Sequence, residues 1–330
     1  MNVTFFSTQP YDKSFFDAEN KMVGFNLQYL EVQLNEQTVK LAQGADAVCI
    51  FVNDQVDASV ITQLVVQGVK IIALRCAGFN NVDLAAAESQ HIKVVRVPAY
   101  SPYAVAEHTI AMIMTLNRKI HKAYNRVREQ NFSLSGLLGF DLHGKTVGVI
   151  GTGNIGQAFC RIMKGFGCRV LAYDVKENKE LMKEGVQYVS LEDLFSKVDV
   201  LSLHCPLNEK TRYMINDTTI KLMKRGIMLI NTSRGGLIDT QTVIKGLKSG
   251  VIGSLGIDVY EQEENLFFRD LSETIIQDDV ISRLMGFSNV LVTAHQGFFT
   301  QEALTQIAET TLSNLREFKN DQPLINQVKL

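Results

Sequence analysis

Three ionisable side chains stand just after apolar runs in the second half of the chain, and their types suit acid–base chemistry on a small anion. Arg234 follows MLINTS, Glu263 lies in GIDVYEQEE, and His295 follows VLVTA. A histidine can exchange a proton near neutral pH, and a carboxylate beside it favours the protonated form. An arginine fork grips a carboxylate in two places and, near a ketone oxygen, stabilises a developing alkoxide. The three residues predict proton transfer to a small carboxylate-bearing substrate.

Each of these residues also has a plain structural interpretation. A buried guanidinium without a partner is costly. Arg234 is therefore solvated, or caps the C-terminus of a neighbouring helix, or pairs with an anion. Glu263 is alternatively a solvated member of the acidic run EQEE. His204 in LSLHCPL also ends an apolar run and is an alternative proton donor, although Pro206 close behind it favours a loop that lines a cofactor.

A glycine motif predicts the cofactor. Gly151, Gly153 and Gly156 have GxGxxG spacing directly after the apolar run TVGVI and directly before a helical pattern. Such a turn places pyrophosphate on the amides of a helix N-terminus. Asp174 ends the next apolar run, where a carboxylate accepts hydrogen bonds from ribose hydroxyls and repels a 2′-phosphate, so we predict NAD over NADP; Lys176 weakens that preference slightly. Nicotinamide carries hydride, and the protein must add the proton donor and a grip on the substrate.

Short apolar runs alternate with helical patterns along most of the chain and predict an α/β protein of parallel sheets built from right-handed βαβ units. Ligands of such sheets bind beyond the carboxyl ends of the strands, where the charged residues above stand. The expected strands are 3–6, 47–52, 69–74, 92–97, 146–151, 169–174, 198–204, 226–231, 253–259 and 290–294.

A length of 330 residues suggests two domains. We expect one doubly wound domain over residues 101–298, and a discontinuous domain of residues 1–100 and 299–330 that is completed by a returning C-terminal helix. From Ser101-Pro102 we expect a single helix of about 25 residues that bridges domains or subunits. His108 and His121 on it are interpreted as structural or solvent-facing rather than as ligands.

Composition limits the partners. Lys+Arg 33 against Asp+Glu 35 gives a net charge of −2 without a long basic tract, so nothing favours nucleic acid or an anionic membrane. The five cysteines lack CxxC spacing and predict a reducing, cytoplasmic setting, with no metal site. The first residues resemble no signal peptide, and no apolar run reaches the length of a membrane span.

Taken together, GTGNIG with Asp174, NTSRGGLID, GIDVYEQE, TAHQ and VPAYSPYAVAEHT resemble the D-specific 2-hydroxyacid dehydrogenase family over essentially the whole length, and most closely its fermentative D-lactate branch. The resemblance implies a Rossmann NAD-binding domain, a flavodoxin-like substrate domain and an active site in the cleft between them. It also implies a homodimer or higher homo-oligomer built around the NAD domain, for which the long helix is suited. About two dozen residues between Glu263 and His295 resemble the lactate branch, whereas Gln296-Gly297 departs from many relatives and puts the shape of the substrate pocket in doubt.

Site residues carry over from the resemblance position by position. It implies that Arg234 binds substrate, that His295 is the acid/base and that Glu263 supports it. The implied substrate-binding residues are Ala77 and Gly78, whose amides hold the carboxylate, with Tyr100, Phe51 and Phe298. The implied cofactor residues are Gly151, Gly153, Asn154, Ile155, Gly156, Asp174, His204, Cys205, Pro206, Thr232 and Asp258, the last of them near the nicotinamide end.

The resulting expectation is an NAD-dependent D-lactate dehydrogenase that interconverts pyruvate and D-lactate. One alternative is a related dehydrogenase for a larger substrate, such as the branched 2-ketoacid 2-ketoisocaproate, hydroxypyruvate or phosphoglycerate; for the last, the sequence offers no clear extra basic residues. Another is a dinucleotide-sensing corepressor on the same fold, because fold does not fix function.

Overall fold

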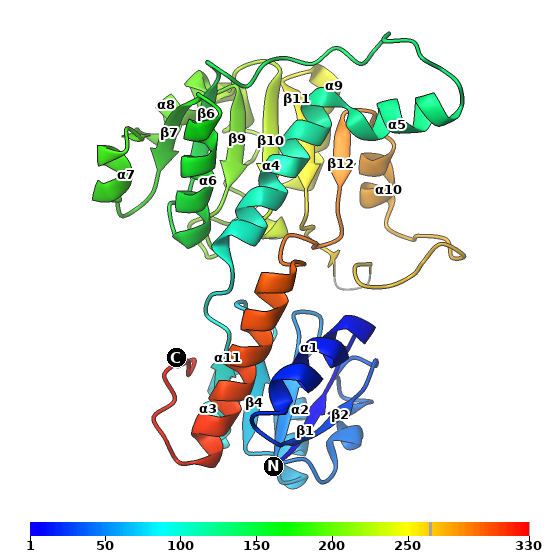
Figure 1. The fold of residues 1–330 in the computed structure, drawn as a ribbon, viewed down its shortest axis with the longest axis vertical. Helices are drawn as coiled ribbons and strands as arrows, with labels where there is room; N and C mark the ends of the chain where they lie inside the picture. The colour runs from blue at the N-terminus through cyan, green and yellow to red at the C-terminus, as the bar shows by residue number, and fades with distance from the viewer. Residues whose placement is uncertain (264–265, 330) are drawn as a thin grey trace. The chain divides into compact units, whose positions relative to one another are not determined.

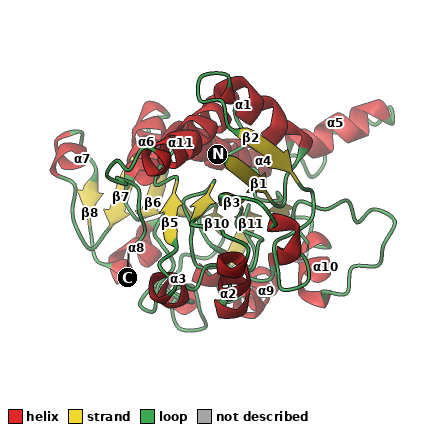
Figure 2. Cartoon of the chain, turned by 90° about the horizontal axis from the view of Figure 1, so that it is seen from below, coloured by secondary structure: helices red, strands yellow, loops and turns green. Residues whose placement is uncertain are grey.

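The computed structural model describes residues 1–263 and 266–329. The chain forms two compact units, one of Met1–Ser101 with Phe299–Leu330 and one of Pro102–Phe298. Each unit is built on its own parallel sheet (Figures 1 and 2). In the described part of the chain, no helix is long and apolar enough to cross a membrane.

The first unit holds a five-stranded sheet in the order β2-β1-β3-β4-β5, the flavodoxin-like order. Its strands are β1 (Asn2–Phe5), β2 (Asn26–Tyr29), β3 (Ala47–Ile50), β4 (Ile71–Leu74) and β5 (Lys93–Arg96). The central strands β3 and β4 are buried at every position, as a parallel sheet covered on both faces requires. The accompanying helices are α1 (Pro10–Asn20), η1 (Val39–Ala42), α2 (Ala58–Val66), α3 (Leu84–Ser89) and α11 (Gln301–Lys319).

Helix α11 belongs to this unit although it follows the other unit in the sequence. It packs against α1, β4 and β5. Thr300 caps its N-terminus by accepting a hydrogen bond from the Ala303 amide. Its buried stripe includes Leu304, Ile307 and Leu312, so one helix supplies much of the cover for one face of the sheet.

The second unit holds a seven-stranded sheet in the order β12-β11-β10-β9-β6-β7-β8, the Rossmann order with one strand added. The strands are β6 (Thr146–Ile150), β7 (Arg169–Tyr173), β8 (Gln187–Tyr188), β9 (Val200–Leu203), β10 (Ile227–Asn231), β11 (Ile252–Ile257) and β12 (Val290–Val292). The helices are α4 (Pro102–Arg118), α5 (Ile120–Arg128), α6 (Asn154–Gly165), α7 (Lys179–Lys183), α8 (Leu191–Lys197), η2 (Ile220–Leu222), η3 (Gly235–Leu237), α9 (Thr240–Ser249) and α10 (Asp279–Met285).

Two apolar cores lie on the two faces of this sheet, because successive strand residues point to opposite sides. One core joins Val147 and Val149 of β6 to α4 and α6, which lie side by side in Figure 1. The other joins Ile150 of the same strand to α8, α9 and α10. The α/β class with two parallel sheets is thereby confirmed.

The expected single long helix after Ser101 is wrong. The chain breaks between α4 and α5 at Lys119, which adopts φ +52°. Tertiary contacts hold the break: the Lys119 ammonium donates to the carbonyl oxygens of Gly136 (2.8 Å) and Leu138 (3.1 Å). The Asn117 side chain pairs with the backbone of Phe140 through bonds of 2.7 and 2.8 Å. The returning segment 136–140 therefore terminates α4 and redirects α5.

Two strands were absent from the sequence prediction. Both β2 and β8 lie at sheet edges, and β8 has only two residues. The letters NLQY of β2 contain no β-branched residue, so local sequence gives little signal for that strand.

Candidate active site

His295 and Glu263 form a hydrogen-bonded pair at the carboxyl end of the larger sheet. His295 lies three residues beyond β12, and its Nδ1 is 3.0 Å from the Glu263 Oε1. The other carboxylate oxygen of Glu263 accepts the Tyr260 amide at 3.0 Å, which fixes the carboxylate. With Nδ1 engaged, Nε2 is the ring nitrogen suited to exchange a proton with a ligand. Glu263 is therefore not merely a solvated member of the acidic run.

The backbone at His295 is left-handed, with φ +53°, a conformation that a non-glycine residue rarely adopts. Asp258, directly after β11, holds it. The Asp258 carbonyl accepts the His295 amide at 2.8 Å, and its carboxylate accepts the Gln296 amide at 2.7 Å and the Gly297 amide at 2.8 Å. One residue thus receives three consecutive amides and fixes the turn that presents the imidazole.

Asp258 is 1% exposed and its carboxylate has two further neighbours. Thr293 Oγ1 donates at 2.5 Å, and His108 Nε2 lies 3.2 Å from the same oxygen. Burial alone raises the pKa of this carboxyl, but the hydrogen bonds from His108, Thr293 and the Gln296 amide bring the pKa below its usual value. The carboxylate is therefore charged and engaged within the protein; its expected contact with nicotinamide stays a prediction.

Arg234 lies between β10 and η3, in a turn shaped by Asn231. The Asn231 side chain accepts the Ser233 amide at 3.1 Å and donates to the Arg234 carbonyl at 2.9 Å. Among residues 1–263 and 266–329 the Arg234 guanidinium makes no ion pair, and its Nη1 donates to the carbonyl of Ser233 at 2.7 Å. It is partly exposed rather than buried, which leaves donors for an anion.

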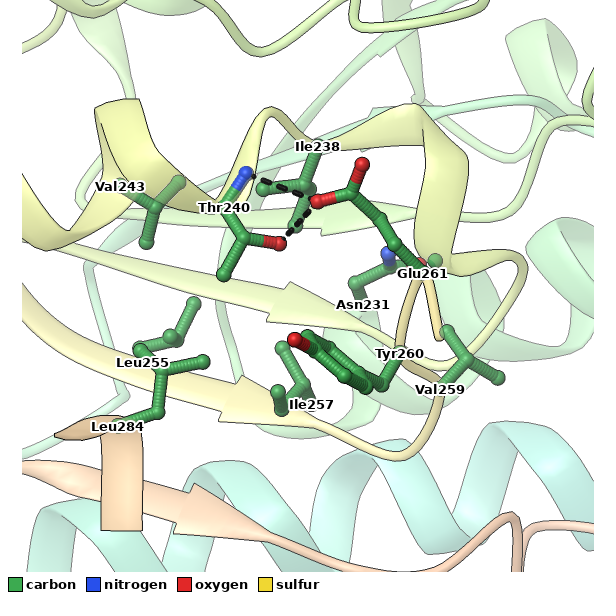
Figure 3. A pocket seen from close by; sticks show the side chains of 11 residues that line it. Asn231, Ile238, Thr240, Val243, Leu255, Ile257, Val259, Tyr260, Glu261 and Leu284 are labelled. Atoms are coloured by element: carbon green, nitrogen blue, oxygen red, sulfur yellow. Dashed lines mark hydrogen bonds between the residues drawn. The ribbon is translucent and has the colours of Figure 1, made fainter. Parts of the chain in front are cut away.

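The turn of Arg234 packs directly on the loop of Glu263. A Cβ added to Gly235 would lie 2.2 Å from the Tyr260 carbonyl carbon and 2.4 Å from the Glu261 amide nitrogen, so only glycine fits there. Glu261 also accepts hydrogen bonds from the Thr240 amide, at 3.1 Å, and from the Thr240 hydroxyl (Figure 3). The loops of Arg234 and Glu263 are therefore locked to each other.

A small cavity lies behind these loops, lined mainly by apolar side chains such as Ile238, Val243, Leu255 and Leu284 (Figure 3). Its volume of about 10 Å³ is barely enough for one water molecule. It is therefore a packing defect behind the site and cannot hold a substrate.

The glycine turn after β6 has the geometry that a dinucleotide needs. Gly151 adopts φ +93°, and a Cβ there would collide with the backbone of His204 and Cys205. A Cβ on Gly156 would meet the Gly151 carbonyl oxygen at 2.0 Å, whereas Gly153 faces open space. Gly153 is the N-cap of α6, so Asn154 and Ile155 begin a helix with no side-chain cap, as a phosphate site requires.

Asp174 follows β7 and reaches the same turn. One of its oxygens accepts the Thr152 amide at 2.6 Å and hydroxyl at 3.1 Å, and the other accepts the Lys176 amide at 3.0 Å. The carboxylate therefore stands at the position where an adenosine ribose is expected, beside the glycine turn.

His204 is packed into the unit rather than presented as an acid. Its Nε2 lies 2.9 Å from the Ser202 hydroxyl, and its ring centroid lies 4.9 Å from that of Phe159. Burial lowers its pKa to about 3, so the ring is neutral at working pH and cannot supply a proton.

Three other expected cofactor residues, Cys205, Pro206 and Thr232, lie at the ends of the neighbouring strands β9 and β10. Ser233 Oγ donates to the Cys205 carbonyl at 2.7 Å, and Thr232 is hydrogen-bonded to Thr109 at 2.9 Å. Pro206 is exposed.

The expected substrate residues are divided between the units. Phe51, Ala77, Gly78 and Tyr100 belong to the first unit, and Phe298 to the second, with its ring centroid 6.4 Å from that of His295. Phe51 follows β3, and its amide donates to Asp54 at 2.6 Å. The turn of Ala77 and Gly78 follows β4, and the Ala77 carbonyl accepts Arg96 Nη1 at 2.7 Å.

Several residues that the sequence did not single out stabilise the two units through their contacts. Arg75 is 2% exposed and donates to the carbonyls of Phe6 at 2.9 Å and Ser7 at 2.7 Å, while its guanidinium lies 4.9 Å from the Phe51 ring centroid. It joins the ends of β1, β3 and β4, two residues before Ala77 in the sequence. Asn231 could have been found as a polar residue at the end of an expected strand. His108 was expected to be structural or solvent-facing, but its place in a helical pattern gave no sign of its contact with Asp258.

Comparisons with known proteins show which proteins this chain is similar to. The model of the D-isomer specific 2-hydroxyacid dehydrogenase NAD binding domain matches residues 110–297. The D-lactate dehydrogenase of Escherichia coli is 53% identical over 328 residues, covering 99% of this chain and 100% of that protein. The "2-hydroxyacid dehydrogenase homolog 1" of Schizosaccharomyces pombe is 53% identical over 328 residues, covering 98% and 99%.

Solved structures of similar proteins have the same fold. The apo-structure of D-lactate dehydrogenase from Escherichia coli has a TM-score of 0.92 at 51% identity and covers 99% of this chain and 100% of that one. D-lactate dehydrogenase from Aquifex aeolicus, complexed with NAD and lactic acid, has a TM-score of 0.86 at 35% identity, with 99% of each chain covered.

Proposed function

Because this chain belongs to the D-isomer specific 2-hydroxyacid dehydrogenase family, we propose that it is an NAD-dependent D-lactate dehydrogenase that reduces pyruvate. That it is an NAD-binding D-2-hydroxyacid dehydrogenase follows from the family; pyruvate as the substrate and the roles of individual residues are the proposal. One observation supports these roles above all: His295 Nδ1 lies 3.0 Å from Glu263 Oε1, in the same unit as the glycine turn.

The residues of the glycine turn fit NAD. Gly153 leaves open space where a side chain would stand, α6 offers the amides of its first turn, and Asp174 stands beside the turn for the ribose. When bound, reduced NAD supplies the hydride for the ketone carbon.

The residues of the chain then handle the proton and the substrate. His295 donates a proton from Nε2 to the ketone oxygen, and Glu263 stabilises the imidazolium through Nδ1. Arg234 pairs with the substrate carboxylate and stabilises charge that develops on the ketone oxygen. The amides of Ala77 and Gly78 orient the carboxylate, with Tyr100, Phe51 and Phe298 as pocket residues. In this scheme the first unit is the substrate-binding domain and the second the NAD-binding domain.

A 2-ketoacid panel tests the substrate. We expect kcat/KM with NADH to be highest for pyruvate, ahead of 2-ketoisocaproate and hydroxypyruvate, and higher with NADH than with NADPH. A larger substrate is the second candidate, because the structure of D-2-hydroxyisocaproate dehydrogenase matches with a TM-score of 0.88 at 32% identity. A higher kcat/KM for 2-ketoisocaproate would favour it. No loss of NADH absorbance with any 2-ketoacid would favour a dinucleotide sensor.

We also propose a homo-oligomer that uses α5 and the segment after it. No residue of α5 is buried, and Ile120, Tyr124 and Val127 are exposed at helical i, i+4, i+7 spacing. Phe132 and Leu138 continue the exposed apolar surface. A second copy of the chain is the natural cover for such a patch. Sedimentation velocity tests it: we expect a dimer or larger species, and a monomer on replacing Tyr124 and Val127 with Asp.

A reducing compartment suits the chain. All five cysteines are free and buried. We therefore place the enzyme in the cytoplasm, which a cell-fractionation measurement checks.

A further inference from the structure

We propose that His108 is a positioning residue of the dehydrogenase reaction: through Asp258 it holds the left-handed turn that presents the His295 imidazole. The inference rests on the proposed function for its kinetic consequences, but the contacts that carry it stand by themselves. They belong entirely to the second unit.

The Asp258 carboxylate is isolated from solvent. The residue is 1% exposed, and a buried carboxylate without donors is strongly disfavoured. Two of its donors are the amides of Gln296 and Gly297, in the catalytic turn itself. The other two come from side chains, Thr293 at 2.5 Å and His108 at 3.2 Å. Any change in side-chain support therefore acts on the same carboxylate that holds the turn.

Nε2 of the His108 ring faces the Asp258 carboxylate. A carboxylate can only accept hydrogen bonds, so the His108 Nε2 that faces Asp258 must carry a hydrogen. The same nitrogen lies 3.2 Å from the Thr293 hydroxyl, which itself donates to Asp258. His108 is therefore the donor that the helix α4 contributes to a three-residue cluster, and this cluster ties α4 to the end of β12.

The backbone of the turn that carries His295 is strained. His295 at φ +53° persists only when its surroundings hold it, because the left-handed region is costly for a residue with a Cβ. The space beside it is also filled: a Cβ on Gly297 would lie 3.0 Å from the Asp258 Oδ2 and 3.6 Å from the His108 ring. Loss of the His108 donor weakens the anchor and lets the turn relax, which moves the imidazole relative to Glu263.

The kinetic test uses His108→Leu, which removes the donor, and His108→Gln, whose amide nitrogen stands the same number of bonds from Cα as Nε2. His143→Leu, at an exposed position of the same unit, is the control. We expect His108→Leu to lower kcat about tenfold to a hundredfold, as a displaced catalytic group does. The KM for pyruvate should stay within about threefold of wild type, because Arg234 binds the carboxylate, and we expect His108→Gln to recover most of the kcat.

Two further readouts separate positioning from folding. With NADH deuterated at the transferred position, the isotope effect on kcat should rise in His108→Leu, because a slower chemical step becomes rate-limiting. The ¹³C-labelled histidine Cε1–H signal of His295, assigned with His295→Gln, should move in His108→Leu and return in His108→Gln. This spectrum needs no turnover, so it tests the positioning even if wild-type protein reduces no 2-ketoacid and the proposed function fails.

Unchanged kcat in His108→Leu would overturn the proposal. So would an unmoved His295 signal, or equal losses in the Leu and Gln variants that track a loss of folded protein, since either result would make His108 a purely structural residue.

Discussion

His204 gives the protein a dependence of stability on pH that a single substitution should remove. Burial lowers the pKa of this histidine in the folded state to about 3, whereas an unfolded chain binds the proton with a pKa of about 6.5. Protonation therefore favours unfolding. The stability that the neutral ring contributes is fully present above about pH 6.5 and is lost as the pH falls toward 3.

The size of the effect follows from these two values. Between them the free energy of unfolding falls by about 1.4 kcal/mol per pH unit, so moving from pH 8 to pH 5 costs about 2 kcal/mol. Part of the His204 residue still contacts solvent, so this figure is an upper value and we expect about 1–2 kcal/mol.

The assay is urea unfolding at pH 8 and pH 5, monitored by far-UV circular dichroism. His204→Gln keeps a neutral polar side chain near Ser202 but cannot be protonated, so its pH-dependent loss should be smaller than that of wild type by about 1–2 kcal/mol. His143→Gln, at an exposed site of the same unit, should behave as wild type. Equal pH-dependent losses in His204→Gln and wild type would refute the reasoning and return His204 to consideration as a proton donor.

Three further predictions concern the proposed reaction. His295→Gln should lower kcat about a hundredfold or more while NADH affinity, measured by fluorescence titration, stays near wild type; wild-type turnover would remove His295 from the mechanism. Arg234→Lys should lower kcat/KM for pyruvate about tenfold to a hundredfold, because the bidentate charged hydrogen bonds are lost, and an unchanged value would make Arg234 structural. Glu263→Gln should lower kcat for pyruvate reduction, because the imidazole loses the carboxylate that holds its Nδ1; an unchanged kcat would exclude that support.

Local sequence was sufficient for much of the architecture. Alternating apolar runs predicted the α/β class, and the glycine spacing after one such run predicted the turn before α6. The pairing of His295 with Glu263 was also expected, because parallel strands bring their carboxyl ends to one edge. These features depend on short-range pattern and on general rules of sheet topology.

What the sequence could not predict depends on contacts between distant segments. The break at Lys119 arises because segment 136–140 returns to bind the end of α4, and no residue before Lys119 signals that return. Likewise, His108 reaches Asp258 only because α4 packs beside β11 and β12. The buried network of Arg75 joins residues more than sixty positions apart. The division of roles between the two units stays a prediction.

The placement of α11 has a consequence for biosynthesis. Strands β1–β5 leave the ribosome about 200 residues before the helix that packs on β4 and β5. At a translation rate of roughly 5–20 residues per second, that delay is on the order of 10–40 seconds. During this interval apolar sheet surface remains uncovered, while the second unit is synthesised and is complete at residue 298, just before α11 begins. Cotranslational folding should therefore finish in the middle of the chain before its beginning.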